Sequence, residues 1–192
     1  SISIFGQLNL TFSGVFPNNT IWIGNTTQFI HNSQEQLQLN ASAAGESTLF
    51  TRYKVPPDSI QFDIYFKMLF APSNDNFCKI YLFIDNTSEI NANGYYLRLG
   101  ENGNNDAIQL WKLTNGSSKM LGSGRMGGVS LDPADGRIQI KIYRNGLWLF
   151  NTDYDGGQLF EEDFEVMDTG FALPDSTYFG LYCKYTSILR TL

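Results

Sequence analysis

The sequence is poor in the residues that most metal and nucleophilic enzyme sites need. Among 192 residues there is one histidine, His31, and there are two cysteines, Cys78 and Cys183. No Cys-x-x-Cys pair occurs, so the sequence argues against a zinc site built from histidine and cysteine. A Ser-His-Asp triad would have to use His31, which lies in a polar Asn/Gln segment, and we expect no such triad.

Positive charge and long apolar runs are also scarce. Thirteen Lys and Arg residues oppose 19 Asp and Glu residues, which gives a net charge of −6. An acidic surface without a basic stripe repels phosphate backbones, so nucleic acid is not an expected partner. No apolar run reaches the ~18 residues of a membrane span, and membrane insertion is not expected either. Residues 1–5 lack the features of a signal peptide, so we expect that a signal was removed or precedes them.

The two cysteines lie far apart in the sequence, each within an apolar strand pattern. Sequence alone does not place their Cα atoms within the range that a disulfide needs. Two buried free thiols are the simpler expectation, and a disulfide is the alternative.

What the sequence does contain is a strong β-strand pattern. Aromatic residues make up 15% of the chain and glycine occurs 18 times, which fits many strands and tight turns. In residues 60–68, apolar side chains such as Ile60, Phe62 and Ile64 alternate with polar ones such as Tyr65 and Lys67. Successive strand side chains point to opposite faces, so this segment is predicted to be a strand with one buried face.

Related patterns predict strands at 8–12, 21–23, 36–39, 47–53, 60–70, 78–84, 95–99, 107–113, 137–143, 147–151 and 178–185. In 78–84, the even-numbered residues are predicted on one face, and Lys79, Tyr81 and Phe83 on the other. Asn145-Gly146 is a strong hairpin signal, and only residues 160–168 are predicted to form a helical turn. Short strands with regularly spaced turns indicate an all-β, antiparallel β-sandwich, with residues 1–192 as a single domain.

Several segments resemble a known family. They are Phe12…Pro17…Trp22-Ile23-Gly24, Leu37-Gln38-Leu39-Asn40-Ala41, Gly94-Tyr95-Tyr96-Leu97-Arg98-Leu99-Gly100, Ile108-Gln109-Leu110-Trp111 and Tyr178-Phe179-Gly180-Leu181-Tyr182-Cys183-Lys184-Tyr185-Thr186. Over nearly the whole chain they resemble secreted Bacteroidetes domains that are similar to the concanavalin A-like lectin/glucanase jelly roll of the laminin G type. The resemblance implies a jelly-roll fold and a secreted or cell-surface location.

The chain departs from this family at its end. The family pattern continues after the Tyr182–Thr186 segment with a final aromatic, Asp-containing strand, where this chain has Ile188-Leu189-Arg190-Thr191-Leu192. Either that strand is degenerate or the chain is one module of a longer protein, and we favour the second interpretation.

The glucanases of this superfamily carry a Glu-x-Asp-x-x-Glu pattern, so catalysis has to be tested. The nearest acidic cluster is 161–165, but counting from Glu161 the third acid would fall at Val166. We therefore predict a solvated acidic turn and no enzyme. A glycoside hydrolase with an unrecognised carboxylate pair stays an alternative.

Lectin-like sandwiches often carry calcium near the rim, and calcium requires several oxygen ligands. Asp153 and Asp155, in the turn of residues 151–157, are the first candidate ligands, and the loop 101–106 is the second candidate. Ordinary turn chemistry is the alternative, because Asp and Asn before Gly are common in hairpins.

The face opposite the apolar residues is rich in aromatic rings. It is predicted to expose Tyr65, Lys67, Tyr81, Tyr96, Arg98, Trp111, Tyr143 and Tyr182. Trp22 and Trp148 are predicted to fill the core, with a position at the rim beside Gly24 as the alternative for Trp22. A flat ring stacks on the apolar face of a sugar while nearby polar groups hold its hydroxyls. The predicted ligand-binding set is Tyr65, Lys67, Tyr96, Arg98, Gln109, Trp111 and Tyr182.

These observations predict a non-catalytic extracellular module that binds a glycan or polysaccharide through an exposed aromatic sheet face. The main alternative is a structural or adhesion module, because cross-strand aromatic pairs also stabilise a sheet without a ligand. In that case, the face contacts protein, including other domains of the parent protein.

Overall fold

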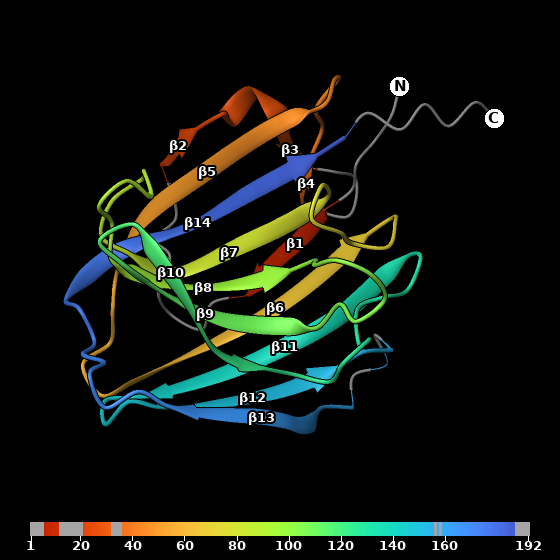
Figure 1. The fold of residues 1–192 in the computed structure, drawn as a ribbon. Coiled ribbons are helices and arrows are strands. Elements are labelled where there is room, and N and C mark those ends of the chain that lie inside the picture. The colour runs from red at the N-terminus through yellow and green to blue at the C-terminus, as the bar shows by residue number, and fades with distance from the viewer. Residues whose placement is uncertain (1–5, 12–20, 32–35, 156, 158, 187–192) are drawn as a thin grey trace.

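Two antiparallel seven-stranded sheets pack face to face (Figure 1). The computed structural model describes residues 6–11, 21–31, 36–155, 157 and 159–186. Sheet A has the order β13 (Glu161–Met167), β12 (Leu147–Asp153), β11 (Ala134–Tyr143), β6 (Ser59–Met68), β1 (Gly6–Thr11), β4 (Leu37–Leu39) and β3 (Phe29–His31). Sheet B has the order β10 (Ser117–Ser123), β9 (Ile108–Thr114), β8 (Gly94–Leu99), β7 (Phe77–Ile84), β14 (Ser176–Tyr185), β5 (Gly45–Lys54) and β2 (Trp22–Gly24). A short 3-10 turn, η1 (Thr26–Gln28), joins β2 to β3.

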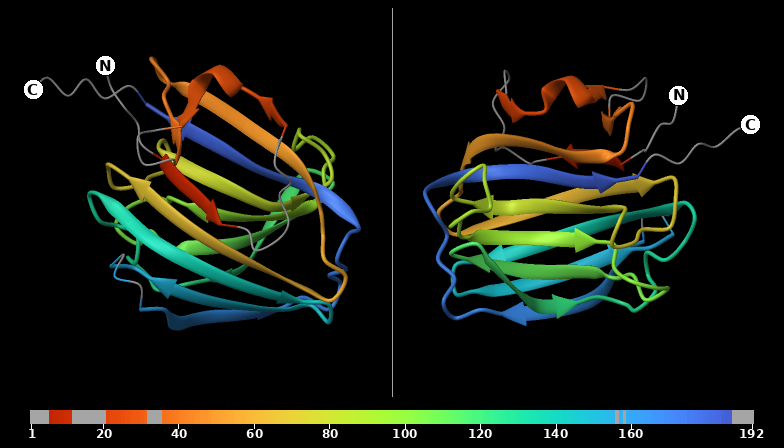
Figure 2. Two further views of the ribbon diagram at one scale, coloured as in Figure 1. Left: turned by 180° about the vertical axis from the view of Figure 1, so that it is seen from behind. Right: turned by 45° about the horizontal axis from the view of Figure 1, so that its top comes forward.

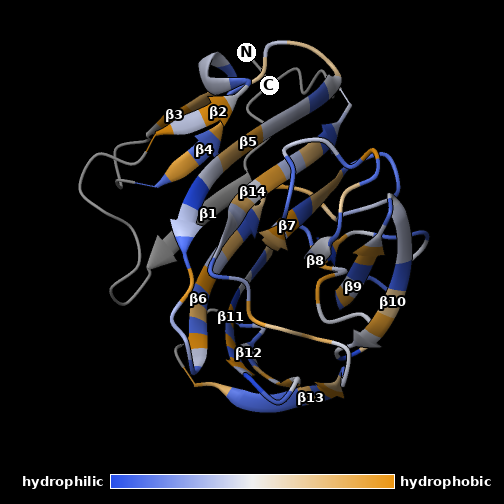
Figure 3. Ribbon diagram, turned by 90° about the vertical axis from the view of Figure 1, so that its left-hand side faces the viewer, coloured by the Kyte–Doolittle hydropathy of each residue, from blue (hydrophilic) through white to orange (hydrophobic). Residues whose placement is uncertain are grey.

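The predicted fold class, an all-β antiparallel sandwich, is confirmed. The two layers are visible in both views of Figure 2. In β6 every second residue from Ile60 to Met68 is buried, and the residues between them are half-buried. Strand β11 alternates in the same way, which appears in Figure 3 as bands of opposite hydropathy along sheet A strands. Among the described residues, no helix is long and apolar enough to cross a membrane.

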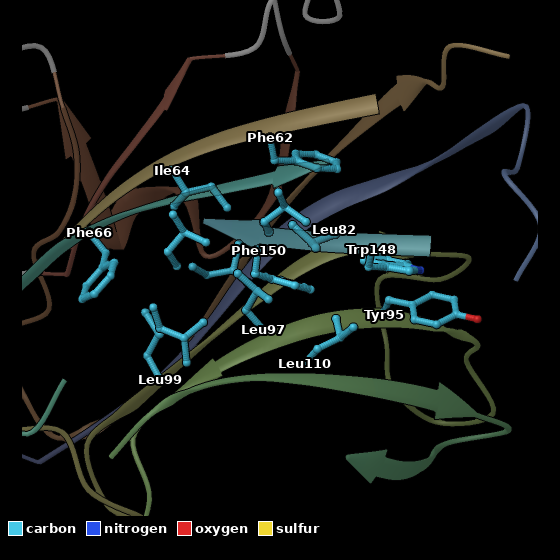
Figure 4. Packing of buried hydrophobic residues seen from close by; sticks show 14 of the residues in the cluster. Phe62, Ile64, Phe66, Leu82, Tyr95, Leu97, Leu99, Leu110, Trp148 and Phe150 are labelled. Atoms are coloured by element: carbon cyan, nitrogen blue, oxygen red, sulfur yellow. The ribbon is translucent and has the colours of Figure 1, made fainter. Parts of the chain in front are cut away.

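The core fills the space between the two sheets (Figure 4). Sheet A contributes Phe62, Ile64 and Phe150, and sheet B contributes Leu97 and Leu110. All of these side chains are at most 2% exposed. Burial of this kind is the main favourable term in folding.

Both tryptophans predicted to fill the core do contact it. Trp148 is fully buried and contacts the rings of Phe83, Tyr95 and Phe171. Trp22 is partly buried and packs against the core from the edge strand β2.

Three strands are absent from the sequence prediction: β3, β10 and β13. The helical turn and solvated acidic turn predicted near residues 160–168 are wrong, because Glu161–Met167 forms the edge strand of sheet A. Its charged residues face solvent on an edge, and a register shift opposite Phe150 and Asn151 interrupts the alternation, so only Phe164 and Val166 retain an apolar signal.

The faces predicted for β7 are correct up to Leu82, which faces the core with Ile80. Tyr81 pairs with Tyr96 and Phe83 pairs with Tyr95, which leaves Leu82 as an extra residue in a β-bulge. Phe83 therefore faces the core between the sheets, and Ile84 joins a cluster with Tyr81 and Tyr96 on the outer face. The prediction placed these two residues on the opposite faces.

Candidate functional site

A row of side chains crosses all seven strands on the outer face of sheet B. Successive cross-strand partners are Met120 (β10), Trp111 (β9), Tyr96 (β8), Tyr81 (β7), Gly180 (β14), Phe50 (β5) and Ile23 (β2). We call these seven residues the aromatic row. Directly opposite residues in a sheet lie close together on one face, so the row forms one continuous strip. Viewed edge-on in Figure 3, sheet B curves so that this face is its hollow side.

The rings of the aromatic row contact one another across the strands. Trp111 and Tyr96 are parallel within 5°, with ring centroids 6.2 Å apart. Tyr96 and Tyr81 follow at 5.5 Å, and Tyr81 and Phe50 at 5.5 Å. The last contact spans β14, which is possible because Gly180 has no side chain: a Cβ there would lie 2.1 Å from Cδ1 of Phe50.

The centre of the aromatic row is buried and its ends are accessible. Tyr81 and Tyr96 are 1% and 3% exposed, so the prediction that they are exposed is wrong. Trp111 is half-buried, and Met120 is 46% exposed. Part of the cover comes from the β7–β8 loop, residues 85–93, whose Ala92 packs in the same cluster and whose Glu89 contacts Tyr81. The sheet end around Trp111 is therefore where a ligand can reach an aromatic surface.

Glu89 fastens the β7–β8 loop to the sheet. Its Oε1 atom accepts a hydrogen bond of 2.5 Å from the Tyr81 hydroxyl and one of 2.6 Å from Nζ of Lys79. Burial, followed by this hydrogen bond, raises the pKa of Tyr81 far above its ordinary value. Tyr81 thus stays a neutral hydrogen-bond donor, and Glu89 stays on the sheet as its acceptor.

A second row, parallel to the first, is polar. Its cross-strand partners are Gln109 (β9), Arg98 (β8), Lys79 (β7), Tyr182 (β14) and Thr48 (β5). We call it the polar row. Together the two rows place an aromatic strip beside hydrogen-bonding side chains.

The two rows together bring five predicted site residues onto one face. Tyr96, Arg98, Gln109, Trp111 and Tyr182 all lie on this face, and Tyr96 and Arg98 lie opposite Trp111 and Gln109, as the hairpin prediction requires. The cation of Lys79 lies between two aromatic rings of this face, 5.0 Å from the Tyr96 centroid and 5.2 Å from the Tyr182 centroid.

Hydrogen bonds within the protein hold the polar row in place. Trp111 Nε1 donates to Gln109 Oε1 at 3.0 Å, and Gln109 Nε2 donates to Glu101 at 2.7 Å. Arg98 donates to the carbonyl of Gly100 at 2.8 Å and to Asn74 at 2.6 Å, and its guanidinium lies 4.5 Å from the Phe77 centroid. Side chains fixed in this way are preorganised, which lowers the entropy lost when a ligand binds.

The two remaining residues of the predicted set lie on the opposite side of the molecule. Tyr65 and Lys67 belong to β6 and face outward from sheet A. There the Tyr65 hydroxyl donates to Asp135 at 3.1 Å, and Lys67 forms an ion pair with the same carboxylate at 3.4 Å. The structure thus separates the predicted set into two surfaces, and only the five residues on sheet B are neighbours.

Asp153 and Asp155 form a turn contact. Oδ1 of Asp153 accepts a hydrogen bond of 3.1 Å from the backbone N–H of Asp155, and Asp153 is 6% exposed. In the second candidate loop, Asp106 accepts a hydrogen bond of 2.6 Å from the N–H of Glu101, and burial raises its pKa. Over the ranges that the structure describes, no group of three His, Cys, Asp or Glu residues could hold a metal ion. In its described residues, neither candidate loop therefore gathers three such side chains around one point.

The acidic strand β13 also has structural contacts. Asp163 accepts hydrogen bonds from the Tyr154 hydroxyl at 2.5 Å and from the backbone N–H of Arg125 at 2.9 Å. His31 lies in β3, and its side chain is outside the described residues.

Sequence reasoning missed several contributors to the site, among them Phe50, Gly180, Lys79 and Glu89. Gly180 lies in the middle of a strongly alternating strand, and an isolated glycine there signals a close approach by another group. Glu89 has no comparable signal, because it lies in a loop and its contact with Lys79 depends on how that loop folds back.

Comparisons with known proteins agree on the fold. Neither a protein-family model nor a curated protein matches the sequence. Among solved structures, the VIP36 exoplasmic/lumenal domain in its Ca²⁺/Man2-bound form matches with a TM-score of 0.63 and 15% identity, covering 87% of this chain and 74% of that one. The carbohydrate-binding module CBM66 from Bacillus subtilis matches with a TM-score of 0.53 and 12% identity, covering 85% and 87%.

A legume lectin-like domain from Entamoeba histolytica also matches, with a TM-score of 0.51 and 12% identity, covering 94% of this chain and 83% of that one. All three neighbours have the concanavalin A-like lectin fold, and this is the fold of the present chain.

Proposed function

We propose that this chain is a non-catalytic, extracellular glycan-binding module whose site is the outer face of sheet B. The observation that carries the proposal is the half-buried Trp111, parallel to Tyr96 and hydrogen-bonded to Gln109 beside the polar row. The solved lectin and carbohydrate-binding neighbours support the substrate class. As part of the proposal, residues 1–192 form one domain of a longer secreted or surface protein.

The chemistry of this face suits a neutral sugar ring. The indole of Trp111 offers a flat apolar surface for the C–H face of a pyranose. Beside it, Arg98 and Lys79 supply donors for hydroxyl groups. Gln109 is only 7% exposed, and its amide oxygen holds the indole N–H of Trp111 in place. Burial, followed by a hydrogen bond with Glu46, raises the pKa of Tyr182, so its hydroxyl stays protonated; because its O–H is donated to Glu46, it can accept a hydrogen bond from a sugar hydroxyl.

The test is a screen of soluble glycans and insoluble polysaccharides with the wild-type protein, Trp111→Ala and Tyr65→Ala. Tyr65 is the matched control, because it is a half-buried aromatic residue on the outer face of the other sheet. We expect Trp111→Ala to weaken binding at least about tenfold and Tyr65→Ala to leave it unchanged, with thermal unfolding measured for both. Loss of binding in Tyr65→Ala alone would place the ligand on sheet A and overturn the proposal.

Calcium enters this proposal only as a variable to test. The VIP36 neighbours are described in Ca²⁺-bound forms, but the described residues of this chain do not provide a three-ligand group. We therefore expect glycan binding to be the same in EDTA and in millimolar calcium. Binding that requires calcium would mean that a site lies elsewhere in the chain.

A structural or adhesion module is the second candidate, and one observation favours it. Tyr81 and Tyr96 are buried within the protein itself, so the centre of the aromatic row stabilises the sheet without any ligand. If the wild-type protein binds no glycan in the screen, this function replaces the first one.

A further inference from the structure

Cys78 and Cys183 lie directly opposite each other on neighbouring strands. Strand β7 pairs with β14, and the register places Cys78 beside Cys183. Both are free thiols, as expected from the sequence, with Cys183 buried and Cys78 half-buried. Their Sγ atoms are 3.8 Å apart, although the residues are separated by 105 positions in the sequence.

This arrangement fits the geometry of a disulfide without movement of the backbone. Opposite residues of an antiparallel pair have Cα atoms roughly 4.5–5.5 Å apart. Disulfides require Cα atoms roughly 4.4–6.8 Å apart. Rotation of the two side chains is therefore enough to bring the sulfur atoms together.

Cys78 is the more exposed of the two thiols, so it is the one that a reagent reaches first. A small apolar pocket is lined by both cysteines together with Leu39, Met68, Phe70, Phe77, Lys184 and Tyr185. The hydrogen bond with Cys183, followed by burial, raises the pKa of the Cys78 thiol, so the pair is slow to react at neutral pH. The described part of the chain offers no third metal ligand beside the two sulfur atoms, which leaves thiol chemistry as the use of this pair.

We propose that Cys78 and Cys183 form a thiol–disulfide site that a disulfide donor, such as oxidised glutathione, closes. One cysteine, as the thiolate, attacks the donor disulfide, forms a mixed disulfide and releases one donor thiol. The second cysteine attacks the mixed disulfide, forms the Cys78–Cys183 bond and releases the other donor thiol. The two cysteines lose two electrons and two protons, and the donor gains them. This inference does not depend on the proposed glycan binding.

The disulfide would join the strands at the edge of the candidate site. Phe77 and Tyr182 flank the two cysteines, and their rings lie 5.7 Å apart on the outer face of sheet B. A covalent link across this pair restrains the unfolded chain over a long loop, so the oxidised protein should unfold at a temperature about 5–10 °C higher.

The test uses the full chain in buffers with increasing ratios of oxidised to reduced glutathione at pH 8, followed by alkylation and mass spectrometry. The expected product has lost two hydrogens, carries no glutathione and yields a Cys78–Cys183 cross-linked peptide. Cys78→Ser and Cys183→Ser are the controls, since each can form only a mixed disulfide with glutathione. Serine is close in size to cysteine, and the wild-type result stands even if one variant folds poorly.

Thermal unfolding of the reduced and oxidised wild-type protein completes the test. Two alkylated thiols at every glutathione ratio, or a protein that carries glutathione on both cysteines, would overturn the proposal. An intramolecular disulfide without a rise in the unfolding temperature would contradict its stabilising role.

Discussion

The outer faces of the two sheets both consist of every second residue of their strands. The side-chain contacts between neighbouring strands differ between the two faces. On sheet B, the aromatic row connects strands through ring contacts between Trp111, Tyr96, Tyr81 and Phe50. On sheet A, amide and carboxylate groups connect strands: Asn151 donates to Gln139 at 3.3 Å and Gln139 donates to Asp63 at 3.0 Å, while within β6 Gln61 also donates to Asp63 at 2.8 Å. We call these four residues of sheet A the polar ladder.

Because of this difference, we expect the two outer faces to stabilise the fold to different degrees. Hydrogen bonds near a surface exchange with water and contribute little net free energy, whereas buried rings contribute through the area they remove from water. The outer face of sheet B therefore forms a second, smaller core with a reachable end at Trp111. The outer face of sheet A is a solvated surface whose polar side chains satisfy one another.

The sharpest test of this contrast removes one side chain from each face. Phe50→Ala removes a ring that is 2% exposed, and we expect it to lower the free energy of unfolding by about 3–5 kcal/mol. Gln139→Ala removes a half-buried amide of the polar ladder, and we expect a loss of about 1 kcal/mol. Urea denaturation followed by tryptophan fluorescence measures both. Equal losses would mean that the two faces stabilise the fold to the same degree.

A smaller loss in the free energy of unfolding is expected when a side chain is added at Gly180, where the aromatic row has none. Gly180→Ala adds a Cβ that meets the Phe50 ring at 2.1 Å, so we expect a loss of about 1–3 kcal/mol. Gly45→Ala, also in sheet B, is the control, because its nearest contact would be 3.6 Å away.

The double variant Gly180→Ala with Phe50→Ala shows whether the ring is the cause. Since the clash is with Phe50, Gly180→Ala should have almost no further effect once that ring is absent. A full additive loss would show that the strain lies in the backbone of β14 instead.

The smallest expected effect is on folding stability at alkaline pH. Burial, followed by interaction with Asp135, raises the pKa of Tyr65 to about 12, and the pKa of Tyr81 is raised further. A raised pKa in the folded state means that stability is complete below the ordinary tyrosine value of about 10 and falls as the unfolded chain ionises above it. We expect Tyr81→Phe to reduce the slope of this loss between pH 10 and about 12 more than Tyr65→Phe does. Unfolding curves at pH 8 to 12 measure how fast the free energy of unfolding falls with pH. A steeper fall in Tyr81→Phe than in Tyr65→Phe would mean that Tyr65, and not Tyr81, has the more strongly raised pKa.

Strands with complete alternation could be predicted from the sequence alone. Strand β6 is an example, because its apolar residues occupy every buried position and its polar residues every outward one. Strand β13 could not, since acids occupy several of its positions and its existence depends on pairing with β12.

The candidate site could be predicted only in part. Tyr65 and Tyr96 both face away from the core, and nothing within either strand shows which sheet it joins. Pairing between distant segments decides this: β6 lies between β1 and β11, and β8 lies between β7 and β9. A prediction of outward faces therefore found the right side chains but combined two surfaces into one.

The bulge at Leu82 has a consequence for how this surface changes with chain length. Because Leu82 is the extra residue, deleting it would leave a regular strand in which Phe83 still faces the core and Ile84 still faces outward, with only the Leu82 side chain lost from the core. At this point β7 can therefore lose one residue and keep both faces, whereas a one-residue deletion in a regularly paired strand moves every following side chain to the opposite face.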